Sequence, residues 1–110
     1  MNRTVFVIAG VAAMTSSQAL ASPRYMLCFG GGRAALYYSN VFPVLEGTKD
    51  ADAAKAFNAF VKGKYGATIF SECHTDLTQA SATSDKKIRE SSDQTSKFPS
   101  KLIETGWAGT

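Results

Sequence analysis

The chain has 110 residues, 45% of them hydrophobic and 19% charged, and a formal net charge of +3 at neutral pH. This mild charge is scattered, and its densest basic spots, Lys62–Lys64 and Lys86–Arg89, are typical of solvated helix faces rather than of a surface for nucleic acid. No apolar run reaches the roughly 20 residues that span a bilayer, so the sequence predicts no membrane span.

Residues 1–21 have the three regions of a bacterial export signal. Arg3 gives a short basic tip, Val5–Met14 is apolar throughout, and the segment ends in Ala19-Leu20-Ala21. This order predicts a signal peptide that is cleaved after Ala21, since small residues precede the cut. We therefore expect a periplasmic or secreted protein whose mature form, residues 22–110, is one small domain.

Two cysteines remain after cleavage, Cys28 and Cys73. An even number of cysteines in an oxidising compartment favours a disulfide between them. Closing a loop of this length contributes up to about 4 kcal/mol in the chain-entropy model. A domain this small has a thin stability margin, so the predicted bridge would be an important part of it.

The first predicted elements form a hairpin. Tyr25–Phe29 is an apolar run typical of a buried strand, and three glycines separate it from Ala34–Phe42, which is rich in aromatic and branched residues. Pro43 ends this second strand because it has no N–H to donate.

Two helices and two more strands are expected after the hairpin. Thr48–Gly66 has apolar residues at helical spacing, with Asp50 or Asp52 as a possible cap, and Gly66 suits the helix end. A strand over Ala67–His74 follows. A second helix is then predicted, with an inward stripe made of Leu77, Ala80, Ser81, Ser84, Ile88 and Ser91.

Residues 91–100 are polar and contain Pro99, so they are expected to form a loop before a last strand over Leu102–Trp107. The predicted order is strand, strand, helix, strand, helix, strand. It indicates an α+β fold with a mixed sheet of four strands and both helices packed on one face.

Several short motifs resemble those of a poorly characterised bacterial exported module. The matching residues are Tyr37–Phe42 (YYSNVF), Phe57–Val61, Tyr65-Gly66, Cys73 and Glu104–Trp107 (ETGW). They cover most of the mature chain. The module has no assigned activity, so the resemblance supports the extent of the domain and implies nothing about mechanism.

Catalytic signatures were weighed against simpler explanations. Glu72, Cys73 and His74 are adjacent, but a zinc site needs three or four ligands, and neighbours on a strand point to opposite faces. The triple glycine lacks the Lys-Ser/Thr of a phosphate loop, and the nine acidic residues show no paired arrangement. The sequence therefore predicts no catalytic residue, no cofactor and no metal. The alternative hypothesis is a small extracytoplasmic hydrolase that uses His74.

The favoured function is a non-catalytic interaction module, accessory or inhibitor-like, whose partner is an unknown protein or cell-envelope component. If both helices cover one face of the sheet, the other face is open, and exposed apolar patches mark partner surfaces. The residues predicted to take part in binding there are Tyr25, Phe29, one or both of Tyr37 and Tyr38, Glu72, His74 and Trp107.

Overall fold

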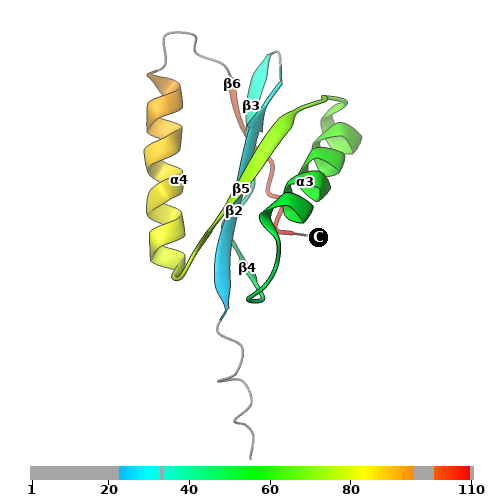
Figure 1. Cartoon of the computed structure of the whole chain (residues 1–110). Coiled ribbons are helices and arrows are strands. Elements are labelled where there is room, and N and C mark those ends of the chain that lie inside the picture. Colours follow the sequence, from blue (N-terminus) through cyan, green and yellow to red (C-terminus); the bar gives the residue numbers. More distant parts are fainter. Residues whose placement is uncertain (1–22, 33, 96–100, 110) are drawn as a thin grey trace, which may run out of the picture.

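The computed structural model describes residues 23–32, 34–95 and 101–109. Its element order is β2 (Arg24–Gly31), β3 (Ala35–Tyr38), β4 (Phe42–Val44), α3 (Asp50–Tyr65), β5 (Phe70–Asp76), α4 (Gln79–Gln94) and β6 (Lys101–Glu104) (Figure 1). Two helices and a mixed sheet confirm the predicted α+β class. The predicted signal peptide lies outside the described residues.

The sheet has five strands, one more than predicted, because the second strand is interrupted. β3 and β4 pair with different halves of the same edge of β2, both antiparallel to it. Between them, three residues (39–41) lie opposite two residues of β2, which is the geometry of a β-bulge. β5 pairs with the other edge of β2, and β6 runs parallel to β3.

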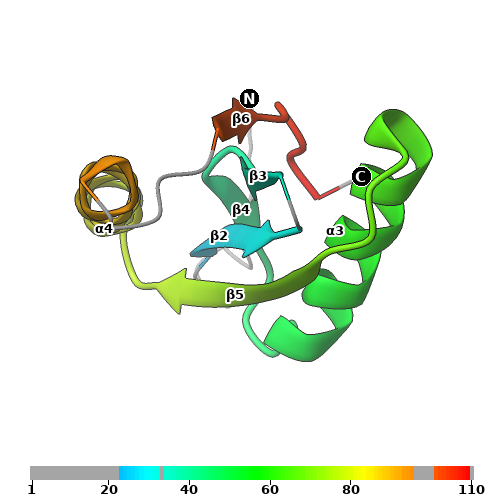
Figure 2. The same ribbon diagram turned by 90° about the horizontal axis from the view of Figure 1, so that it is seen from above.

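The two helices lie on opposite faces of the sheet, so the prediction that both pack on one face is wrong (Figures 1 and 2). The strand order explains this difference. The connection β4–α3–β5 crosses the sheet in one direction, and β5–α4–β6 crosses it in the opposite direction. Crossovers between parallel strands are right-handed, so reversing the direction moves the second helix to the other face.

α3 forms as its periodicity predicts, and it supplies one wall of the main core. Phe57 and Val61 are fully buried, and Gly66 ends the helix with a φ of 70°. Glycine suits this left-handed position because it has no Cβ. The helix begins after Lys49, which makes no side-chain cap, while Asp50 and Asp52 lie in its first turn.

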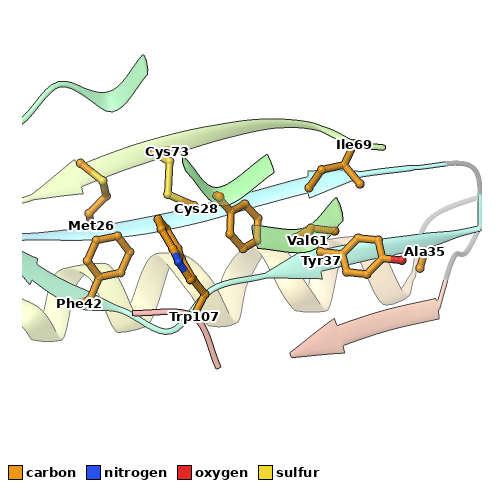
Figure 3. Packing of buried hydrophobic residues seen from close by; sticks show 10 residues of the cluster. Met26, Cys28, Ala35, Tyr37, Phe42, Val61, Ile69, Cys73 and Trp107 are labelled. Atoms are coloured by element: carbon orange, nitrogen blue, oxygen red, sulfur yellow. A yellow bond between two sulfur atoms is a disulfide. The ribbon is translucent and has the colours of Figure 1, made fainter. Parts of the chain in front are cut away.

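The core between α3 and the sheet contains the disulfide. Cys28 and Cys73 are bonded and face each other across β2 and β5, with Cα atoms 4.0 Å apart, which confirms the predicted bridge. Both are buried together with Met26, Phe42 and Trp107 (Figure 3).

α4 packs on the other face in a way that the sequence did not reveal. Its only fully buried residue is Ala82, and the predicted inward stripe is wrong: Ile88 is 64% exposed and Leu77, just before the helix, is 67% exposed. The half-buried side instead carries mostly charged residues, Asp85, Lys86, Arg89, Glu90 and Asp93. The helix also continues through residues 91–94, which were expected to be in a loop.

Candidate functional site

The residues predicted to form one binding face are divided between the two faces of the sheet. Tyr37 and Trp107 belong to the core under α3. Trp107 packs against Phe42 (Figure 3) and against Phe57, each with its ring centroid 5.3 Å away. These two aromatic residues therefore stabilise the fold on the side opposite to the proposed surface.

The other candidates, Phe29, Tyr38, Glu72 and His74, meet on the face that α4 covers, and Tyr25 shares their face of β2 by strand alternation. The cysteines occupy the α3 side as expected, but the opposite face is not open, because α4 lies over it (Figure 2). The expectation of an uncovered sheet face is therefore wrong, while four of the predicted residues do come together.

Phe29 is the centre of this group. Its ring lies 5.9 Å from that of Tyr38 and 5.5 Å from that of His74, centroid to centroid. The guanidinium of Arg89 lies 4.3 Å from the Phe29 centroid, which places a cation over the ring face. Arg89 therefore helps to hold α4 against the sheet. No local sequence pattern predicts its contact with Phe29.

His74 makes polar contacts only through Nε2 among the described residues. Nε2 is 3.2 Å from Oε1 of Glu72 and 3.5 Å from a guanidinium nitrogen of Arg89. Arg89 can only donate, whereas a hydrogen bond to Glu72 requires Nε2 to donate, so the shorter contact favours a ring protonated at Nε2. In that form Nε2 has no lone pair to act as a base.

Tyr38 connects the sheet to the last turn of α4. Its ring is 1% exposed, and its hydroxyl donates a hydrogen bond to Asp93. Burial, and then the hydrogen bond and negative charge of Asp93, raise the pKa of Tyr38 well above its usual value. The hydroxyl therefore stays protonated and acts as a donor.

Lys86 and two glutamates form a second charged contact between α4 and the sheet. Lys86 Nζ donates to the main-chain oxygen of Ser39 at 2.9 Å and pairs with Glu104 at 2.7 Å. Burial and a hydrogen bond with Glu104 raise the pKa of Glu90 to about 7. Burial opposes ionisation of Glu104, but hydrogen bonds with Glu90 and Lys86 outweigh it and lower its pKa.

The two longest resemblance motifs, YYSNVF and ETGW, meet at the β-bulge. Ser39 Oγ accepts from the Cys28 N–H at 2.9 Å and donates to the Asn40 carbonyl. The Asn40 N–H donates to the Trp107 oxygen, and Thr105 donates twice to the Tyr38 oxygen. These motifs therefore hold the interrupted strand against β6 and the segment that follows it.

Carboxyl pairs do form in three dimensions, although none was visible in the sequence. Glu90 hydrogen-bonds Glu104, and Asp76 hydrogen-bonds Asp85. Burial, and then the hydrogen bond and negative charge of Asp85, raise the pKa of Asp76. Glycoside hydrolysis needs carboxyl groups roughly 5–9.5 Å apart, whereas the two carboxyl groups of each pair are in hydrogen-bond contact. No group of three or more metal-ligating side chains occurs within the described parts of the chain.

A shallow hollow lies where α4 ends, near the tip of the β2–β3 hairpin. We call it the tip hollow; it has a volume of about 340 Å³ and is lined by Phe29, Gly30, Gly31, Leu36, Phe70, Ser71, Glu72 and Asp93. Phe70 beside it is 88% exposed. Sequence reasoning missed Phe70, although strand alternation places it on the same face as Glu72 and His74.

Gly30 and Gly31 leave the floor of the tip hollow without side chains. A Cβ at Gly30 would lie 2.3 Å from the Phe70 oxygen, and one at Gly31 would lie 2.9 Å from a Leu36 methyl. Glycine is therefore required at position 30, where β2 approaches the backbone of β5, whereas at position 31 the flexible Leu36 side chain could move aside.

Comparison with protein-family models, with curated proteins and with solved structures found no match. In the part of the chain that the structure describes, no helix is both long and apolar enough to cross a bilayer.

Proposed function

We propose that this protein is an exported, non-catalytic interaction module that binds a protein or cell-envelope component at the tip hollow. The observation that carries the proposal is Phe70, which is 88% exposed beside a hollow lined by Phe29 and Leu36. Large apolar side chains that gather around a surface depression are typical of partner sites. The buried disulfide in so small a domain supports an extracytoplasmic location.

The chemistry of the tip hollow indicates what a partner would present. Apolar walls from Phe29, Leu36 and Phe70 lie beside the carboxylates of Glu72 and Asp93. The last turn of α4 carries no basic residue, and a helix C-terminus is itself partly negative. An apolar side chain with a neighbouring basic group fits this arrangement best.

The alternative, a hydrolase that uses His74, has less support. The contacts of His74 are with Glu72, Arg89 and Phe29, and none of these is a hydroxyl or thiol that His74 could activate as a nucleophile. Among the described residues, no serine, threonine or cysteine side chain hydrogen-bonds the His74 ring.

Capture from envelope extract of the native host tests the proposal. We expect the oxidised protein to retain a defined partner, and Leu36→Gln to lose most of it, because the change makes one wall of the tip hollow polar. Ile88→Gln is the matched control, since Ile88 is 64% exposed on α4 and does not line the tip hollow. Equal capture by both variants would contradict the proposed surface, provided that both keep the wild-type thermal midpoint.

A further inference from the structure

We propose that the protein forms a symmetric dimer in which β5 pairs antiparallel with β5 of a second copy. The two-fold axis passes beside Cys73, the middle residue of Phe70–Asp76. This interface shares Phe70 and Glu72 with the tip hollow, whereas Leu36, on the other wall of the hollow, lies on β3 beyond β2 and outside the interface. The result would be a sheet that continues from one copy into the other.

The hydrogen-bonding pattern of β2 shows which groups of β5 face outward. Cys28 uses both its N–H and its C=O toward Ser39, on the β3 side. Cys28 and Cys73 are therefore a non-hydrogen-bonded pair, so the N–H and C=O of Cys73 point away from β2. By alternation Ser71 and Thr75 do the same. Within the described residues, no strand pairs with this edge (Figure 2).

The β5 edge carries two charged residues, Glu72 and Asp76, but lacks several other features that usually prevent strands from pairing. Its sequence, FSECHTD, contains no proline and no lysine, and it pairs with β2 over its whole length without a bulge. Native proteins normally protect a free edge of seven residues with one of these devices.

The side chains of β5 are complementary to themselves in this register. Pairing about Cys73 places Glu72 directly opposite His74 of the second copy, and His74 opposite the other Glu72. Both sit at non-hydrogen-bonded positions of the new pair, where opposite side chains are closest. Two carboxylates and two imidazoles then meet at the centre of the interface.

The two ends of β5 carry exposed apolar residues. Phe70 is 88% exposed at the start of the strand, and Leu77 is 67% exposed just after its end. Antiparallel pairing places the start of one strand beside the end of the other. Each Phe70 therefore lies directly opposite Asp76 of the second copy, with Leu77 of that copy one residue further along.

Other two-fold registers fit less well. An axis beside Glu72 or His74 would place that side chain opposite its own copy, and would leave the outward backbone groups of Thr75 or of Ser71, respectively, without a partner in β5. An axis beside Thr75 would leave most of one strand without a partner, since β5 ends at Asp76. Only the register about Cys73 satisfies the whole edge.

Sedimentation analysis of the oxidised protein over a concentration series tests the proposal. We expect a monomer–dimer equilibrium for the wild type. His74→Glu places a carboxylate opposite Glu72 of the second copy, so the dissociation constant should rise roughly tenfold. The double variant Glu72→His/His74→Glu exchanges the two residues, and we expect it to restore the dimer.

Ile88→Glu is the control for a general effect of added negative charge, because Ile88 lies on the exposed side of α4. It should leave the dissociation constant unchanged. A monomeric wild type would overturn the proposal, and so would a dimer that tolerates His74→Glu or a double variant that does not recover. If Leu36→Gln loses partner capture but keeps the wild-type dissociation constant of the dimer, the dimer interface and the partner site are distinct, and each proposal stands or falls by its own test.

Discussion

Lys86 on α4 donates a hydrogen bond from Nζ to the main-chain oxygen of Ser39, 2.9 Å away, although 47 residues separate them in the chain. Ser39 is fully buried in the β-bulge, and the Lys86 side chain is 17% exposed. A lysine in the middle of a polar helix therefore supplies the hydrogen-bond donor for a buried main-chain oxygen at the interrupted strand.

Lys86→Met should destabilise the fold. The methionine keeps most of the apolar stem but leaves the Ser39 oxygen without this donor and Glu104 without its partner. We expect a loss of about 1–3 kcal/mol in the free energy of unfolding, measured by urea titration. Lys87→Met, at the neighbouring exposed position, should change it by less than about 0.5 kcal/mol. Similar losses in both would contradict the role assigned to Lys86.

Tyr38→Phe should weaken the docking of α4, whereas Tyr37→Phe should not. The Tyr38 hydroxyl bonds Asp93, while that of Tyr37 has no hydrogen-bond partner among the described residues. Removing the Tyr38 hydroxyl should cost about 1–2 kcal/mol, because it leaves a half-buried carboxylate unpaired. Thermal unfolding followed by circular dichroism compares the two, and an equal effect would argue against the Tyr38–Asp93 contact.

The stability of the protein should depend on the protonation of Glu90. The folded protein raises the pKa of Glu90 from 4.5 to about 7, so it holds this proton more tightly than the unfolded chain does. The stabilisation is therefore present at low pH and is lost as the pH rises through about 7. The lowered pKa of Glu104 has the opposite effect on stability, because it favours the folded protein at higher pH. This effect changes only below about pH 4.5, outside the pH range in which Glu90 titrates.

Glu90→Gln provides the test, because its amide can donate to Glu104 at every pH. We expect the thermal midpoint of the variant to match the wild type near pH 5 and to exceed it by about 2–4 °C near pH 8. A constant difference between the two proteins across this range would contradict the raised pKa.

Export with cleavage after Ala21 is a prediction from the sequence alone. Mass spectrometry of the protein recovered from the envelope or medium of its native host should find an N-terminus at Ser22. Recovery of the protein with Met1 intact from an extracytoplasmic fraction would refute the cleavage site.

Local sequence patterns predicted the helices and strands better than they predicted the order of the strands in the sheet or the faces on which the helices pack. The apolar spacing of Phe57 and Val61 was sufficient to place α3 and its inner side, and Gly66 marked its end. The cysteine count was sufficient for the disulfide. The order of the strands in the sheet is set by long-range pairing, such as β6 with β3, and no local pattern contains it. The opposite placement of the helices follows from that order.

The sheet-facing side of α4 was predicted wrongly because it is polar. Hydropathy assigned Ile88 to the sheet side, whereas Lys86 and Arg89 occupy it through contacts with Ser39 and Phe29. Such contacts depend on residues far away in sequence, so periodicity cannot reveal them. For the candidate site, the group of Phe29, Tyr38, Glu72 and His74 was anticipated, but Phe70 and the tip hollow appeared only in the fold.

Site-specific photo-crosslinking in the native host tests the interaction module most directly. A photoreactive amino acid at position 36 lies in the tip hollow, and the same group at position 88 lies on the exposed side of α4. We expect position 36 to form a discrete adduct with another envelope component and position 88 to form none. No adduct from position 36, or the same adducts from both positions, would contradict the proposed function.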